Sequence, residues 1–216
     1  MDAASYRAHM RRTLGDTNGA RYSDELLDEA LRWALAVYSQ ANPQVMRTVL
    51  TLPGAGREHS LAALEGLSAV LEVYYPHREG LEPPRCESWR CYTRQAGLWL
   101  YLESSRIPTA GEGVLLVYTA RHSIAGLDTA GQSSLPPADE YLFSNGAAGK
   151  AAQNRGLYLI EAYGSRSAEA GKLQAWAEAR IGEFMSGLNG LKTAQSLPGD
   201  RPAGWRLDEW DHRTAS

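Results

Sequence analysis

Apolar side chains recur at helical spacing between residues 23 and 42. Four of them, separated by four, three and four residues, form one face: Leu27, Leu31, Ala34 and Tyr38. Ser23 precedes them as a favourable N-cap residue, and the two carboxylates after it suit the first turn, where the helix dipole favours negative charge. Asn42-Pro43 ends this predicted helix. A shorter helix is predicted over residues 6–14, with Gly15 in the position of a left-handed C-cap.

After Pro43 the pattern changes to short runs rich in β-branched and aromatic residues, separated by glycine or proline clusters, which is typical of strands and hairpins. We expect four to six strands, and five candidates cover residues 45–52, 68–75, 89–94, 98–103 and 114–120. Their connections are too short to hold crossover helices, so the sheet should be largely antiparallel. Residues 68–75 alternate, which predicts that one side of this strand packs on a core. Ala69, Leu71, Val73 and Tyr75 lie on one side, and Val70, Glu72 and Tyr74 lie on the other.

Helical spacing returns in the last third of the chain. A helix is predicted over residues 141–163, and its glycines and alanines at 146–152 suit close packing against another helix. A break at Gly164-Ser165 precedes a second helix with one apolar face: Leu173, Ala177, Ile181, Phe184, Leu188 and Leu191. These two helices should form an antiparallel hairpin.

The predicted fold class is α+β, a helical bundle interrupted by a central antiparallel β insertion. The N-terminal bundle helices occupy residues 1–43, the β insertion 44–122, the C-terminal helices 123–192 and an irregular tail 193–216. The tail carries Trp205, Leu207 and Trp210 in a Pro/Gly-rich segment without a core of its own. Exposed tryptophan is unfavourable, so the tail either folds back on its own subunit or docks on a partner.

Tryptophan and arginine are enriched among interface hot spots, which favours docking on a partner or a neighbouring subunit. The predicted partner-binding residues are therefore Trp205, Arg206, Leu207 and Trp210.

Composition restricts the class of protein without choosing a role. The chain has 216 residues, 44% apolar and 22% charged, as in an ordinary globular protein of one domain with an insertion, or two small domains. Its 22 basic and 25 acidic side chains give a net charge of −3, which offers no electrostatic footprint for nucleic acid or an anionic membrane. Apolar runs of about five residues are far shorter than the roughly 20 of a membrane helix. Residues 1–12 lack the apolar segment of a secretory signal, so we expect a soluble protein.

The candidate catalytic and metal-binding motifs in the chain each lack residues that the motif requires. Cys86 and Cys91 are too few for a disulfide scaffold and lack the paired spacing of a zinc site, so we expect two half-buried thiols. Residues 146–150 resemble the end of a phosphate-binding loop, but Ser144 and Ala151 stand where that loop needs glycine and a hydroxyl residue. The five histidines are scattered, and the loop around His122 has no nucleophile elbow. We therefore expect no catalytic residue, no metal and no cofactor.

The densest basic group lies near the N-terminus, at Arg7, Arg11 and Arg12. On a helix Arg7 and Arg11 share a face, which could contact phosphate, or pair with carboxylates at a solvated or interface surface. Paired carboxylates elsewhere in the chain fall at helix starts or in the tail, where dipole compensation or solvation explains them.

Two stretches carry a family resemblance. The first comprises Leu14-Gly15-Asp16, residues 21–27, Ala30-Leu31 and Tyr38, and the second comprises residues 117–122, 124–128, 135–137 and 146–152. In order and spacing, across residues 10–190, the chain resembles the head-tail connector (adaptor) proteins of tailed bacteriophages. The motifs are structural ones, a cap, a turn and helix packing, and the tail from residue 193 lies outside them.

The resemblance implies a helical bundle with a β-rich insertion that assembles as a ring, usually twelvefold, beneath the portal protein of the filled capsid. Such a ring extends the DNA channel and provides the platform for tail or tail-completion proteins, so the location would be the virion, assembled in the host cytoplasm. Genomic DNA would pass without sequence-specific binding, and a modest net charge suits a conduit with few phosphate contacts. The resemblance implies no catalytic residue.

Two other classes stay open. A carbohydrate- or receptor-binding tail module could use aromatic residues of the β insertion as a stacking platform: Trp89, Tyr92, Trp99 and Tyr101. Strand aromatics are more often core residues or cross-strand pairs. An enzyme of unrecognised type would need a pocket with perturbed titratable groups, which a sequence does not reveal.

Overall fold

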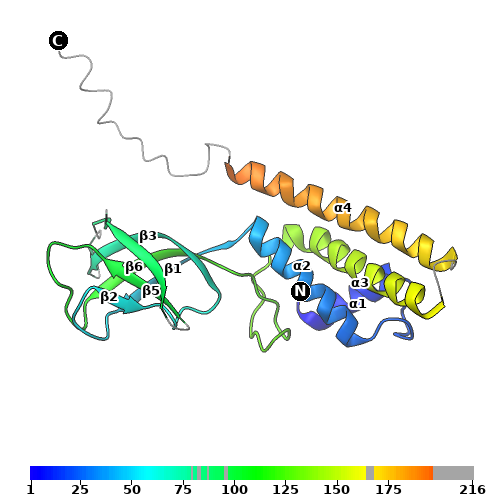
Figure 1. The fold of residues 1–216 in the computed structure, drawn as a ribbon, viewed down its shortest axis with the longest axis horizontal. Helices are drawn as coiled ribbons and strands as arrows, with labels where there is room; N and C mark the ends of the chain where they lie inside the picture. The colour runs from blue at the N-terminus through cyan, green and yellow to red at the C-terminus, as the bar shows by residue number, and fades with distance from the viewer. Residues whose placement is uncertain (79, 82–83, 87, 95–96, 164–167, 197–216) are drawn as a thin grey trace, which may run out of the picture.

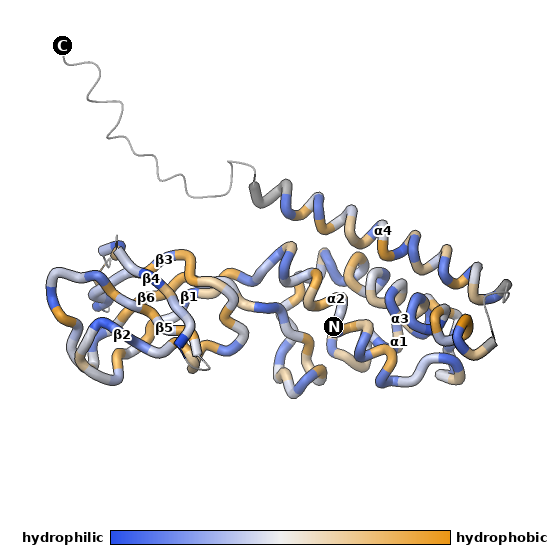
Figure 2. Tube along the Cα trace, in the orientation of Figure 1, coloured by the Kyte–Doolittle hydropathy of each residue, from blue (hydrophilic) through white to orange (hydrophobic). Residues whose placement is uncertain are grey.

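The computed structural model describes residues 1–78, 80–81, 84–86, 88–94, 97–163 and 168–196. Helices form one end of an elongated molecule and strands form the other (Figure 1). The α+β class is confirmed. Hydrophobic positions occur throughout both ends (Figure 2), and they form two separate cores, one in each part.

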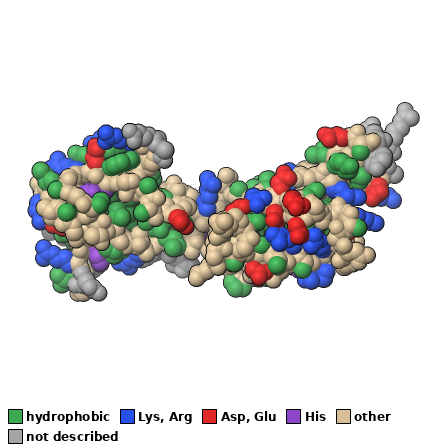
Figure 3. Space-filling view, turned by 90° about the horizontal axis from the view of Figure 1, so that it is seen from below, with side chains coloured by type: hydrophobic (Ala, Val, Ile, Leu, Met, Phe, Trp, Pro, Cys, Tyr) green, Lys and Arg blue, Asp and Glu red, His purple; other side chains and the backbone are tan. Residues whose placement is uncertain are grey.

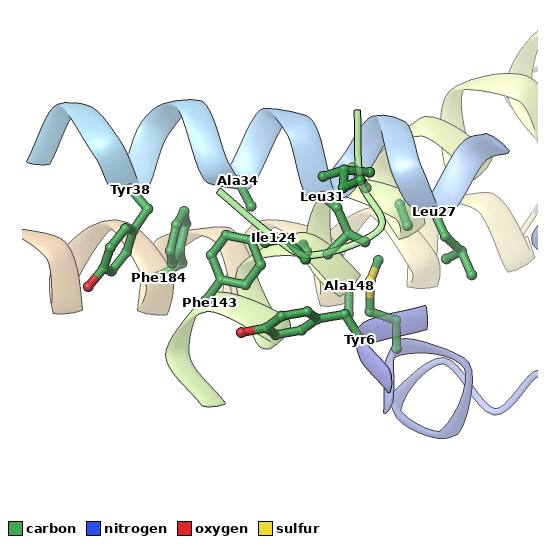
Figure 4. Packing of buried hydrophobic residues seen from close by; sticks show 14 of the residues in the cluster. Tyr6, Leu27, Leu31, Ala34, Tyr38, Ile124, Phe143, Ala148 and Phe184 are labelled. Atoms are coloured by element: carbon green, nitrogen blue, oxygen red, sulfur yellow. The ribbon is translucent and has the colours of Figure 1, made fainter. Parts of the chain in front are cut away.

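In the part of the chain that the structure describes, the helical part contains four helices: α1 (Ala3–Thr13), α2 (Asp24–Ala41), α3 (Glu140–Tyr163) and α4 (Ala168–Ser196). A short 3-10 turn, η1 (Pro137–Asp139), precedes α3. All four predicted α2 face residues are fully buried, and Figure 4 shows them packed with residues of α1, α3 and α4. Tyr6 and Phe143 meet edge to face at the centre, with ring centroids 5.2 Å apart.

The start of α2 and the end of α1 follow the local signals of the sequence. The Ser23 hydroxyl accepts a hydrogen bond from the Leu26 amide, as an N-cap does. Gly15 adopts φ +64°, the left-handed conformation that ends a helix. Asp16 is buried after it, and its carboxylate accepts hydrogen bonds from the amides of Arg21 and Tyr22, which fixes the loop between α1 and α2.

Helices α3 and α4 pack as the predicted antiparallel hairpin, and glycine makes the close approach possible. A Cβ atom added to Gly146 would lie 2.4 Å from Cγ of Phe184, and one added to Gly149 would lie 2.9 Å from Cβ of Arg180. Farther along, a Cβ on Gly187 of α4 would lie 2.7 Å from the methyl groups of Leu142. The predicted role of these small residues is confirmed, because no side chain fits between the helices at these points.

The described residues of the β part form six strands: β1 (Gln44–Thr51), β2 (Glu58–Ser60), β3 (Leu67–His77), β4 (Trp89–Arg94), β5 (Gly97–Leu102) and β6 (Gly113–Ala120). All pairings are antiparallel, as predicted, but the strands form two sheets, sheet A (β1-β6-β3) and sheet B (β2-β5-β4). The three-residue β2 escaped prediction because it is too short for a periodic signal. Inward side chains of both sheets share one core.

The prediction of a single inward face over residues 68–75 is wrong in its first half. Val73 and Tyr75 are buried, but Leu71 is 45% exposed, and Val70 packs on the core instead. The pairing of β3 with β6 shifts register between Val70 and Glu72. A β-bulge inserts an extra residue on one strand, so the side chains after it change faces relative to those before it.

A polar cluster ties the β part to the bundle where the chain leaves α2 and returns from β6. The His122 ring lies 2.9 Å through Nε2 from the carbonyl oxygen of Asn42 and 3.0 Å through Nδ1 from the Ser134 hydroxyl. Its backbone amide donates to the Ser39 hydroxyl at 3.0 Å. The Tyr38 hydroxyl donates to Asp139 at 2.5 Å, next to the ring of His122. The cluster joins segments about 100 residues apart, so His122 has a structural role here.

Candidate functional site

The four predicted partner-binding residues, Trp205, Arg206, Leu207 and Trp210, lie outside the described residues. Their role therefore stays a prediction. The described residues offer three other features of functional interest: the basic group of α1 and the outer faces of the two sheets.

The basic group of α1 faces carboxylates of the same chain. Arg7 holds Asp28 with two hydrogen bonds, from Nε at 2.6 Å and from Nη2 at 2.9 Å, and both side chains are mostly buried. Arg11 pairs with Asp24 at 2.7 Å. The hydrogen bond to Asp28 raises the pKa of Arg7 further. Of the two alternatives for this group, the structure has the carboxylate pairing, since α1 and α2 bring the opposite charges together.

Acidic and basic side chains are also interspersed over the bundle surface seen in Figure 3. The described residues form no large basic patch on this face that could bind the phosphate backbone of a nucleic acid.

The outer face of sheet A carries exposed aliphatic side chains on its edge strand β1, next to buried Leu115 and Thr119 of β6. Residues directly opposite each other in a sheet point to the same side, and the register gives three rows across it. These rows are Val45-Thr119-Ala69, Arg47-Val117-Glu72 and Val49-Leu115-Tyr74. Val45 is 63% exposed and Val49 46%, although both are aliphatic strand residues. Exposed apolar surface of this kind is typical of protein interfaces.

The outer face of sheet B carries aromatic rings under arginine side chains. Tyr92, Trp99 and Tyr101 lie on this face by register, whereas Trp89 points inward and packs on the core. Arg90 stacks over the Tyr101 ring at 4.9 Å and Arg94 over the Trp99 ring at 5.8 Å. Of the four aromatic residues proposed as a stacking platform, three are therefore on one face and Trp89 is not.

The arginines of sheet B are themselves paired. Arg90 lies 2.9 Å from Glu103, and Arg94 lies 3.2 Å from Glu58. This outer face is therefore balanced in charge and half covered by its own side chains.

Neither cysteine forms a disulfide, and both are half-buried, as expected. Burial raises the pKa of the Cys86 and Cys91 thiols, which disfavours the reactive thiolate. Within the described residues, no three His, Cys, Asp or Glu side chains converge as a metal site. No described helix is both long and apolar enough to cross a membrane.

The most strongly perturbed carboxylate lies in the loop before β6. The backbone amide of Thr109, the Tyr75 hydroxyl and the Arg106 guanidinium all donate to Glu112 and lower its pKa to about 2. The same contacts hold the 104–112 loop against β3. Glu112 is thus an ionised structural group, and it faces hydrogen-bond donors rather than an open cleft.

No family model and no curated protein matches the chain. Among solved structures, a chain from the neck of an empty gene transfer agent particle, computed with C6 symmetry, is similar at 19% identity and a TM-score of 0.32. That match covers 68% of this chain and 76% of the other. A chain from the virion of a native gene transfer agent particle is similar at 21% identity and a TM-score of 0.33, covering 83% and 88%. TM-scores this low do not carry a functional argument.

Proposed function

We propose that the protein is a structural component of a phage-like particle, a head-tail connector that forms a ring beneath the portal. The ring extends the DNA channel and provides the attachment platform for the tail. One observation carries the proposal: residues from both stretches of the family resemblance, which are distant in the sequence, meet in the core of the bundle. The residues that belong both to the resemblance and to this core are Tyr22, Leu27, Ala30, Leu31, Tyr38, Ile124, Leu127, Leu135, Ala147, Ala148 and Ala151. Two further residues of the resemblance, Tyr118 and Ala120, pack in the core of the β part.

The electrostatics of the bundle suit a conduit. Each phosphate that a protein neutralises adds salt-dependent affinity for DNA, so a channel wall should keep its arginines occupied. Arg7 and Arg11 are held by Asp28 and Asp24, and the net charge of the whole chain is −3. DNA would therefore slide past without sequence-specific contacts, and the function needs no catalytic residue, cofactor or metal.

In this proposal the partners are the portal protein, tail or tail-completion proteins and identical subunits, twelve in number by the family resemblance. The interface between subunits is heterologous and closes by rotation. The tail contributes Trp205, Arg206, Leu207 and Trp210 to the contact with the portal or with a neighbouring subunit. The protein would reside in the virion after assembly in the host cytoplasm.

Imaging of the protein mixed with the portal of its own particle tests this function. Negative-stain micrographs should show a ring coaxial with the portal, and a variant truncated after residue 196 should bind the portal more weakly. A protein that stays monomeric and ignores the portal contradicts the connector role. A truncated variant that still binds and assembles fully contradicts only the role of the tail.

A carbohydrate- or receptor-binding tail module is the second candidate. It is favoured by the shared outward face of Tyr92, Trp99 and Tyr101, because aromatic faces stack on sugar rings. Glycan-array binding by the monomer, abolished by Trp99→Ala and retained in Trp33→Phe, would support it. Absence of binding across the array, together with ring formation on the portal, would exclude it.

A further inference from the structure

The outer face of sheet A, defined above by its three cross-strand rows, ends at an open edge. The strand order β1-β6-β3 places β1 at one side of the sheet. Residues 84–86 cover part of the opposite edge, where the Tyr75 amide donates to Pro84 and the Cys86 amide donates to Val73. Within the described residues no strand pairs with the outer edge of β1. Its backbone donors and acceptors are therefore open to an added strand.

The open edge also lacks the usual protection against pairing. The outward side chains of β1 are Val45, Arg47, Val49 and Thr51, with one charge among them and no proline. Natural edge strands are commonly short, bulged or densely charged, which prevents association with other chains. An eight-residue regular strand with exposed valines is instead suited to strand addition.

A segment with a matching pattern lies outside the described residues, in the C-terminal tail. Residues 205–208 read Trp-Arg-Leu-Asp, so apolar and charged side chains alternate with the period of a strand. An extended conformation places Trp205 and Leu207 on the same side. Tryptophan and leucine there would cover the apolar rows of sheet A, while the backbone pairs with β1.

The charges of the two partners are complementary. Arg47 stands between the exposed valines of β1, and no described carboxylate forms an ion pair with it. The tail carries three carboxylates in succession around its last tryptophan: Asp208, Glu209 and Asp211. Glu72, the acidic group of the same sheet face, already accepts from Tyr74 at 2.7 Å and pairs with Arg85 at 3.5 Å. The tail carboxylates therefore have a positive partner on this surface that no described carboxylate occupies.

We propose that residues 205–211 of one copy add as a strand to the free edge of β1 in a second copy and cover the outer face of its sheet A. This inference rests on the proposed ring, and it names the contact that joins one subunit to the next. A heterologous contact needs two different surfaces on each subunit: one docks on the next subunit, and the other binds the docking surface of the previous subunit. The tail and sheet A are two such surfaces.

The starting point of the tail is compatible with this reach. Helix α4 ends at Ser196, at the end of the bundle that faces the β part (Figure 1). Eight residues separate Ser196 from Trp205, and the nine Cα-to-Cα steps between them span about 30 Å in an extended chain. A tail of that length can extend well away from α4 toward a second copy.

Disulfide trapping between separately tagged full-length chains tests the contact. Both chains carry Cys86→Ser and Cys91→Ser, one carries Val49→Cys, and the other carries Leu207→Cys. We expect a disulfide-linked heterodimer that forms roughly tenfold faster than with Met185→Cys in place of Val49→Cys, since docking raises the local thiol concentration. Met185 is a matched control, because it is 44% exposed on α4 and Val49 is 46% exposed on β1.

Two further variants separate a specific contact from chance collision. Arg47→Glu in the receiving chain should lower the rate of trapping by repelling the tail carboxylates, whereas Arg180→Glu on α4 should leave it unchanged. Equal trapping at positions 49 and 185 overturns the inference. So does a single chain carrying both Val49→Cys and Leu207→Cys that closes an internal disulfide as a monomer, since the tail would then cover its own sheet.

Ring formation on the portal is scored independently by imaging. A ring without trapping between positions 49 and 207 removes this inference and leaves the connector function in place. Trapping without any ring supports the contact between tail and sheet A and contradicts the connector function.

Discussion

Substitution of Gly146 by alanine tests the packing of α3 on α4 most directly. Two effects oppose each other. Alanine in a helix interior is favoured over glycine by about 1 kcal/mol. The new Cβ, however, would lie 2.4, 2.7 and 2.8 Å from three ring carbons of Phe184, whose side chain is fully buried and has no free space to move into. Overpacking of a core costs about 1–3 kcal/mol, and contact with three ring atoms belongs at the upper end. We therefore expect Gly146→Ala to destabilise the bundle by about 1–2 kcal/mol.

Gly182→Ala is the matched control on the partner helix. It lies inside α4, and a Cβ there would meet no atom within 4 Å, so only the helix-propensity gain of about 1 kcal/mol applies. Urea unfolding followed by circular dichroism at 222 nm reports on the helices and should place the two variants about 2–3 kcal/mol apart, on opposite sides of the wild type.

A second background isolates the clash. Phe184→Ala itself creates a cavity at a cost of about 3–5 kcal/mol, and it removes the ring that the new Cβ would strike. Gly146→Ala should become neutral or stabilising there, so the two substitutions should be strongly non-additive. If Gly146→Ala proves as stable as Gly182→Ala in the wild-type background, the argument from close packing is refuted.

Three further predictions concern polar contacts. Arg7→Ala should lower the free energy of unfolding by about 1–3 kcal/mol in urea titrations, because Asp28 loses two charge-assisted hydrogen bonds, and Arg7→Lys should restore less than half, because one ammonium cannot reproduce both. Tyr38→Phe should cost about 1–2 kcal/mol by the same assay, because the bond to Asp139 is lost while the ring stays packed; an unchanged midpoint would contradict this. The lowered pKa of Glu112 stabilises the fold above its ordinary value of 4.5, and this contribution is lost as the pH falls through about 2. Melting temperatures at pH 6 and pH 3 should therefore fall less steeply for Glu112→Gln than for the wild type.

The helices and most strands were predictable because their signals are local. Three features act within a few residues or a single helix face, so they could be predicted from the local sequence. They are the N-cap at Ser23, the left-handed Gly15 and the small residues at 146–152. Strand β4 was predicted with its observed bounds, and the other long strands within two residues at each end. The candidate interfaces were harder to predict from the sequence. Neither the open edge of β1 nor the outward-facing aromatic residues of sheet B leave a local sequence signal.

By itself, the sequence determined where helix and strand form, that the insertion is antiparallel, and that the bundle packs through small residues, because backbone propensity and periodicity act over short distances. Only the tertiary structure decided that the strands divide into two sheets, that a bulge at Val70 and Glu72 reverses the faces of β3, and that Arg7 pairs with Asp28. Each of these depends on strand partners or helices distant in the chain, and a pattern read along one segment does not specify its neighbour in space.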